Sequence, residues 1–221
     1  MHMHRRSRAS GFTFVEILVV LGIIVTLMGM VAVVVPHIQR KTRRTMSLNN
    51  VRNLALLLSD RSVDYGWPGL DGKSFTLSLV AHGLIDIRNP DNLNVLFSPG
   101  DVWYTREKTP TQLYREVTPK ALRNGSDFHS LTSYAGRRNA TPGHLITPNL
   151  LRQNVPILGD DDDGPVHDPE GLVLGFSDGS ARFLRWDDLE MAAPDDMDAP
   201  ARFLGDSAAD GRGWLQGLAS E

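Results

Sequence analysis

One uncharged stretch constrains this chain more than any other feature. Residues 17–35 read ILVVLGIIVTLMGMVAVVV and contain no charged side chain. As a helix this run is about 28 Å long, at about 1.5 Å per residue. With Phe12, Phe14 and Val15 it is long enough to cross a hydrocarbon core of about 30 Å. A cleaved secretory signal peptide fits less well, because the run is long and no A-x-A-like site follows it. The sequence therefore predicts one membrane-spanning helix.

Glu16 lies directly before this run, and a plain membrane anchor does not explain it. A carboxylate next to hydrocarbon is costly unless it has a partner. A free amine at Phe12 would be such a partner, because positions 12 and 16 lie one helical turn apart. The carboxylate could also reach the amine of a neighbouring chain that is offset along the axis of a bundle. Either pairing requires a cut between Gly11 and Phe12.

The residues around Glu16 resemble a known processing signal. The hexapeptide GFTFVE at residues 11–16, after a short basic leader and before an apolar run, is similar to the class III signal of type IV pilins and type II secretion pseudopilins. The resemblance implies that prepilin peptidase cuts after Gly11 on the cytoplasmic side and that the new N-terminal Phe12 is methylated. It also implies that the apolar helix anchors the subunit and later forms a filament core, with Glu16 required for assembly. The implied partners are prepilin peptidase, other pilin or pseudopilin subunits, an inner-membrane assembly platform and membrane lipid.

Other segments resemble a narrower group of pilin-like proteins that are numerous in planctomycetes. Residues 46–54 (MSLNNVRNL) and 65–68 (YGWP) are similar to a stretch of those proteins. His167 followed by the pair at 178–179 resembles their C-terminal His–x9–Asp-Gly signature, with one residue more between the two parts. Those proteins often carry a cysteine at or beside the position of Leu48, whereas this chain has no cysteine.

The basic residues do not decide which way the chain crosses the membrane. Arginines at positions 5, 6 and 8 precede the apolar run, and a second basic cluster at residues 40–44 follows it, so the positive-inside rule favours neither side. The resemblance implies the inner (cytoplasmic) membrane, with the leader in the cytoplasm and the C-terminal domain periplasmic or extracytoplasmic. The expected segments are a leader (1–11), a transmembrane and filament-core helix (12–36), an amphipathic helix (37–66), a globular domain (67–193) and a C-terminal tail (194–221).

The remainder of the chain predicts an α+β fold. Apolar residues recur at helical spacing after the membrane segment, so the helix should continue with one apolar stripe. This stripe consists of Leu48, Val51, Leu54, Ala55 and Leu58. Pro36 should kink or interrupt the helix. Short apolar runs predict strands, and the Asp-Gly pair at 178–179 predicts a hairpin turn. The predicted strands cover residues 93–97, 131–134, 155–158, 172–176 and 181–186. The resemblance implies that the long helix packs on this small antiparallel sheet, as in pilin-like folds.

An acidic segment is the best candidate for a metal site. It contains Asp160, Asp161, Asp162 and Asp163, followed by His167 and Asp168. Clustered carboxylates suit a hard cation such as Ca²⁺. The resemblance points to the same ion, because major pseudopilins bind calcium in a C-terminal loop. The spacing does not match an EF-hand loop, and a solvated acidic loop without metal is the alternative.

Composition and one short motif argue against several other classes. The formal net charge of −3 disfavours a nucleic-acid-binding protein, and the lack of cysteine excludes disulfides, thiolate metal sites and a cysteine nucleophile. The segment GFSDG at 175–179 matches the G-x-S-x-G pattern of serine hydrolases. That pattern requires a strand, a turn and a helix, whereas the residues after Ser177 alternate like a strand and include no histidine. We therefore expect that the protein is not an enzyme.

Two functions remain after these exclusions. The first is a structural subunit, a pseudopilin or minor pilin, of a type II secretion or type IV pilus-like filament. The alternative is a single-pass, membrane-anchored extracytoplasmic binding protein that does not polymerise. Only the first function requires Glu16.

Overall fold

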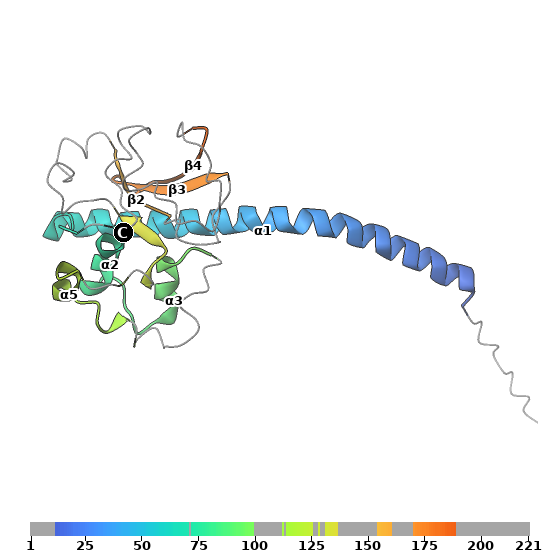
Figure 1. The fold of residues 1–221 in the computed structure, drawn as a ribbon, viewed down its shortest axis with the longest axis horizontal. Helices are drawn as coiled ribbons and strands as arrows, with labels where there is room; N and C mark the ends of the chain where they lie inside the picture. Colours follow the sequence, from blue (N-terminus) through green and yellow to red (C-terminus); the bar gives the residue numbers. More distant parts are fainter. Residues whose placement is uncertain are drawn as a thin grey trace, which may run out of the picture. The chain divides into compact units, whose positions relative to one another are not determined.

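The computed structural model describes residues 12–70, 72–99, 112, 114–125, 128, 131–136, 154–160 and 170–188. It combines one long N-terminal helix, several short helices and a four-stranded antiparallel sheet (Figure 1). The α+β prediction is therefore confirmed. By their internal contacts the residues form two compact units, Met1–Lys41 and Thr42–Glu221.

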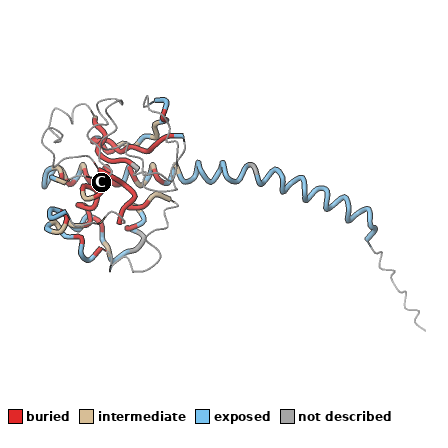
Figure 2. The backbone as a smooth tube through the Cα atoms, in the orientation of Figure 1, coloured by how far each residue is buried: buried red, intermediate tan, exposed pale blue. Residues whose placement is uncertain are grey.

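Helix α1 runs from Phe14 to Tyr65. In the unit that ends at Lys41 it contains the apolar run, and every side chain of that run that the structure describes is exposed (Figure 2). Among the described residues, α1 is the one helix that is long and apolar enough to cross a membrane. Pro36 lies inside the helix, so the predicted interruption does not occur. A proline removes one N–H donor from the backbone hydrogen bonds of a helix, and the bonds of the neighbouring turns hold the helix together.

In the second unit α1 is amphipathic, as the sequence predicted. Val51, Leu54, Ala55 and Leu58 are fully buried, and Leu48 packs at the edge of the same core. The opposite side of the helix is exposed (Figure 2).

Gly66 ends this helix. Its φ of 71° lies in the left-handed region, and its N–H donates to the carbonyl of Ser62 over 3.1 Å. This is the usual glycine termination of a helix, and Pro68 prevents continuation two residues later.

The sheet has the order β1-β2-β3-β4, with every neighbouring pair antiparallel. Its strands are β1 (Tyr134–Gly136), β2 (Pro156–Asp160), β3 (Gly171–Phe176) and β4 (Ala181–Arg185). The last three agree with the predicted strands to within two residues at each end, whereas β1 begins where the predicted strand 131–134 ends.

The β3–β4 hairpin turns at the predicted Asp-Gly pair. Gly179 has a φ of 78°, and the Asp178 carboxylate accepts a hydrogen bond from the Ser180 N–H over 2.8 Å. The pair forms the turn because glycine tolerates positive φ and aspartate bonds its own backbone two residues on.

Strand β3 lies directly on the buried stripe of α1. A Cβ atom added to Gly175 would lie 2.9 Å from Val51 Cγ1 and 3.2 Å from the Ala55 Cβ. All residues of β3 are buried, whereas those of β4 are half-buried or exposed. In the described part of the chain β4 pairs only with β3, and it includes Arg182 and Arg185, which are both exposed.

Helix α2 (Gly72–Ala81) is an element that the sequence analysis did not anticipate. It lies against β1, where Gly72 forms an isolated bridge with Gly136 and the Phe75 side chain occupies the space that a Cβ on Gly136 would need. Most of α2 is buried on both sides, so its segment GKSFTLSLVA shows no one-sided apolar pattern.

The strand predicted at residues 93–97 is wrong. The chain there forms α3 (Pro90–Leu93) and a single 3₁₀ turn, η1 (Asn94–Leu96). A proline favours the first helical turn, and Leu93 and Leu96 reach the core because they lie three residues apart. The side chain of Asn50 donates to the carbonyls of Asn94 (3.2 Å) and Phe97 (2.9 Å), which ties this turn to α1.

Helix α5 (Pro119–Arg123) is short and was also not anticipated. Its N-cap is Thr118, whose Oγ1 accepts a hydrogen bond from the Ala121 N–H over 3.2 Å. This is a standard way of satisfying a free N–H at a helix start.

Candidate functional site

The candidate site for processing and assembly lies at the start of α1. Phe12 is the first described residue and is 86% exposed, while Gly11 lies outside the described residues. The backbone N–H and the hydroxyl of Thr13 both donate to Oε2 of Glu16, over 2.7 and 2.8 Å. In return, the Glu16 N–H donates to the Thr13 hydroxyl over 3.3 Å. Thr13 and Glu16 thus form a capping box, in which each side chain satisfies a free N–H of the other.

The capping box gives Glu16 a partner within its own chain. The two bonds from Thr13 end on Oε2, and neither engages Oε1. The carboxylate therefore keeps one oxygen for a further donor. Sequence reasoning missed this contact, although Thr-x-x-Glu before an apolar run is the recognised signature of a capping box.

The predicted pairing of Glu16 with an amine at Phe12 belongs to the cut chain. The structure contains residues 1–11 ahead of Phe12, so that nitrogen is part of a peptide bond here. The pairing stays a prediction.

The helix that follows Glu16 presents apolar surface on all sides. Val25, for example, is 68% exposed, and no part of the most apolar stretch is buried. Thr26 is the single polar side chain of residues 17–35, and its hydroxyl donates to the carbonyls of Ile23 (2.8 Å) and Gly22 (3.1 Å). A surface of this kind is typical of helices that contact an apolar medium, either lipid or other apolar helices.

The acidic segment begins at the end of β2 and leads to β3. Asp160 is the last residue of β2, opposite Tyr134 of β1. The remaining predicted metal ligands lie outside the described residues; they are Asp161, Asp162, Asp163, His167 and Asp168. Within the described ranges no three His, Asp or Glu residues come together in a group that could hold a metal. The calcium site stays a prediction.

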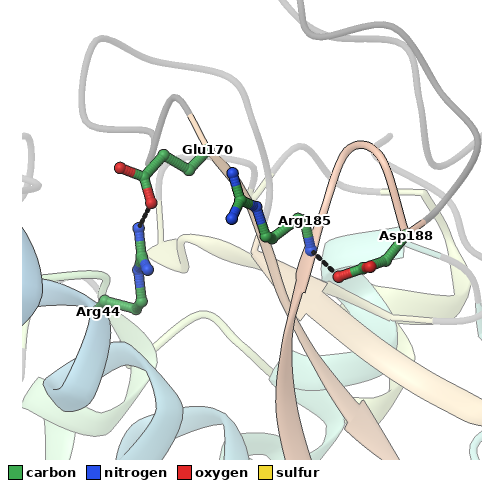
Figure 3. A network of polar contacts seen from close by, with 4 residues as sticks. All are labelled: Arg44, Glu170, Arg185 and Asp188. Atoms are coloured by element: carbon green, nitrogen blue, oxygen red, sulfur yellow. Dashed lines mark hydrogen bonds and ion pairs between the residues drawn. The ribbon is translucent and has the colours of Figure 1, made fainter.

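An ion pair ties the residue before β3 to α1. Arg44 Nη2 lies 2.8 Å from Oε2 of Glu170, immediately before β3, and the two side chains point toward each other (Figure 3). The Arg44 guanidinium also lies 3.8 Å from the ring centroid of Phe183 on β4. Beside them the Arg185 N–H donates to the Asp188 carboxylate over 3.2 Å (Figure 3). Because the Glu170 side chain is 46% exposed, the ion pair contributes at most about 1 kcal/mol.

The GFSDG segment does not form the nucleophile turn of a hydrolase. β3 ends at Phe176 and β4 begins at Ala181, so the motif is a strand, a turn and a second strand. Ser177 is buried, and its N–H donates to the carbonyl of Val155 over 2.9 Å. The motif therefore lacks the helix that exposes a catalytic serine in hydrolases.

Comparisons of this chain with protein-family models, curated proteins and solved structures give no significant match. The geometry by itself defines an α+β protein with one exposed apolar helix of membrane-spanning length near its N-terminus.

Proposed function

We propose that this chain is the precursor of a pilin-like subunit, a pseudopilin or minor pilin, of a type II secretion or type IV pilus-like filament. In this proposal prepilin peptidase cuts between Gly11 and Phe12, and the new amine of Phe12 is methylated. The apolar part of α1 holds the subunit in the inner membrane, with the C-terminal domain on the extracytoplasmic side. An assembly platform then moves subunits into a filament whose core is made of these helices. The role is structural and not enzymatic.

The observation that carries the proposal is a carboxylate at the start of an uncovered apolar helix. Glu16 precedes a run whose described side chains are all exposed, which supports a location where lipid or other apolar helices cover that run. Oε1 of Glu16 is not engaged by Thr13 and can accept from the amine of a neighbouring subunit. In apolar surroundings such an ion pair is favourable only with good geometry and further hydrogen bonds, and Thr13 supplies those bonds.

The capping box is also the observation that favours the alternative, a membrane-anchored binding protein that does not polymerise. Glu16 accepts two hydrogen bonds from its own chain and so has a local role without any neighbour. The two functions differ in what they require of Glu16. A lone anchor needs only a well-formed helix start, whereas a filament needs the negative charge.

Mass spectrometry of the protein isolated from its native membrane tests the processing step. The expected N-terminus is a methylated Phe12. A protein that still begins at Met1 would refute the filament function, because the amine that Glu16 should meet would not exist.

Replacement of Glu16 by alanine tests the assembly step. We expect normal membrane insertion and loss of filaments. Unchanged filament yield, or a protein that forms no filament even as wild type but binds a soluble ligand, would favour the lone anchor.

A further inference from the structure

A buried arginine lies near the end of α1 without a carboxylate partner in the described part of the chain. Arg61 is 6% exposed, and no Asp or Glu among the described residues forms an ion pair with it. Its Nη1 donates to the carbonyl of Gly66, the residue that ends the helix. Its Nη2 lies 3.3 Å from Nε2 of His82. A buried cation requires polar partners, so the imidazole of His82 is one of the two described groups that stabilise Arg61.

The contacts of His82 determine which of its ring nitrogens carries hydrogen. Nδ1 lies 2.8 Å from the carbonyl oxygen of Ser78, one turn earlier in α2. A carbonyl only accepts, so Nδ1 must carry a hydrogen and donate it. A guanidinium only donates, so Nε2 must be without hydrogen and accept from Arg61. Both contacts are therefore satisfied by one form of the side chain, the neutral imidazole with its hydrogen on Nδ1.

A second proton on His82 would break its contact with Arg61. Two donors and two positive charges would then face each other across the 3.3 Å between Nη2 and Nε2. The carbonyl end of α2 favours a positive imidazolium, but it carries only about half an elementary charge. The full charge of Arg61 lies in direct contact with the ring and outweighs it. Tyr65 of α1 also faces the ring, with 6.2 Å between centroids, and a phenol ordinarily carries no charge at neutral pH.

The contact between Arg61 and His82 joins the ends of two helices. Arg61 belongs to the last turns of α1 and also bonds Gly66, whereas His82 directly follows the last residue of α2. Next to this contact the rings of Trp67 and Phe75 stack, with 6.4 Å between their centroids. Loss of the bond to His82 would leave the turn after α1 with fewer contacts to α2.

We propose that Arg61 and His82 form a pH-sensitive lock between the ends of α1 and α2, which is closed while His82 is neutral and opens when the imidazole is protonated. The folded structure accommodates only the neutral ring, whereas the unfolded chain accepts a proton freely. The stability that the lock contributes is therefore present at high pH. It is lost as the pH falls through the range in which histidine ordinarily titrates, about pH 8 to pH 5. The proposal does not rest on the filament function, because it concerns contacts within the second unit.

Thermal unfolding of the full chain in detergent at pH 8 and pH 5 tests the lock. Between these values the Tm of the wild type should fall by about 3–10 °C more than that of His82→Gln, as expected when one hydrogen bond to a charged group is lost. Glutamine does not titrate, and its amide oxygen can accept from Arg61. His37→Gln, exposed on α1, is the matched control and should keep the full response of the wild type. Equal decreases for the wild type and His82→Gln would overturn the proposal.

Nitrogen NMR of the wild-type chain at pH 8 tests the geometry without any substitution. The ring of His82 should show a protonated Nδ1 and an unprotonated Nε2. The opposite tautomer, or a ring that is already doubly protonated at pH 8, would contradict the assignment on which the lock depends.

Hydrogen exchange locates the effect within the fold. After correction for the intrinsic effect of pH, exchange in residues 61–68 should become at least about tenfold faster at pH 5 than at pH 8, the factor that corresponds to loss of one such bond. Strand β3, which does not contact the lock, should change much less. An equal acceleration of both segments would show global destabilisation and would overturn the proposal of a local lock.

Discussion

The two roles open to Glu16, helix cap and partner of a neighbouring amine, make opposite predictions for the variant Glu16→Gln. Glutamine keeps the side-chain oxygen that accepts from Thr13, so the capping box can form, and it removes only the negative charge. If the residue acts only as a cap, the free energy of assembly of this variant should differ from that of wild type by less than about 0.5 kcal/mol. If it pairs with an amine in apolar surroundings, the amine loses its counter-ion. Breaking a buried pair costs about 3–5 kcal/mol, more than 100-fold in the assembly equilibrium.

Thr13→Ala makes the complementary change. It removes the hydroxyl that bonds Glu16 Oε2 over 2.8 Å but keeps the backbone N–H and the charge. Loss of an N-cap side chain costs about 0.5–2 kcal/mol, which is about 2- to 30-fold. We therefore expect Glu16→Gln to abolish filaments and Thr13→Ala to reduce them mildly. Thr13→Ser keeps a hydroxyl and is the matched control.

The assay compares filament yield with the amount of subunit in the membrane. Filaments are sheared from cells and quantified against total membrane-inserted protein, and the N-terminus of each variant is checked by mass spectrometry. A Glu16→Gln variant that is cut normally and assembles like wild type would refute the charge-pairing argument. A Thr13→Ala variant that fails as completely as Glu16→Ala would show that capping alone accounts for the effect of Glu16.

Three further predictions concern the second unit and are measured by unfolding the full chain in detergent. Gly171→Ala should destabilise it by about 3 kcal/mol or more, because the new Cβ would overlap the Leu184 carbonyl oxygen, a backbone atom that cannot move without opening the sheet. Leu58→Ala should cost about 2–5 kcal/mol, since this side chain is fully buried, and a loss below about 1 kcal/mol would contradict the packing described for α1. Burial raises the pKa of Asp178, but hydrogen bonds, led by those from Ser180, more than offset this and hold the pKa below its ordinary value. The contribution of the Asp178 carboxylate to the free energy of unfolding should therefore be present above the unfolded pKa of about 3.9, and it should be lost as the pH falls through the lower folded pKa. The loss of stability caused by Asp178→Ala should accordingly shrink between pH 7 and pH 2. A loss that stays constant over this range would contradict this account.

The elements that sequence reasoning found correctly are those with a strong local signal. The second half of α1 was predicted because its apolar stripe recurs at helical spacing and is buried. The β3–β4 hairpin was predicted because Asp178 and Gly179 are suited to the turn that joins two short strands. In both segments a short-range pattern in the sequence is enough to set the local conformation.

The elements that were missed depend on contacts with distant residues. The alternating polar and apolar residues of α2 do not indicate a helix, because β1 and the rest of the core bury it on both sides. Residues 93–97 read as a strand, yet Asn50 of α1 fixes them as a 3₁₀ turn.

The candidate site was also predicted unevenly. Glu16 was singled out by its position before the apolar run, but its bond to Thr13 was overlooked although the signature is local. The ion pair of Arg44 with Glu170 joins residues 126 positions apart, and no local pattern could indicate it.

Strand β4 has a consequence for how such a protein avoids the wrong kind of association. An edge strand offers unpaired N–H and C=O groups to any strand from another molecule, and charged side chains on the edge oppose such pairing. Among the described strands β4 lies at the edge of the sheet. Arg182 and Arg185 provide these charges, and the Arg182 guanidinium lies 5.2 Å from the Phe176 ring centroid on the neighbouring strand. In the proposed filament, a subunit crowded against its copies would be exposed to sheet-to-sheet aggregation. The two arginines would oppose that route, whichever other contacts the subunits of the proposed filament make.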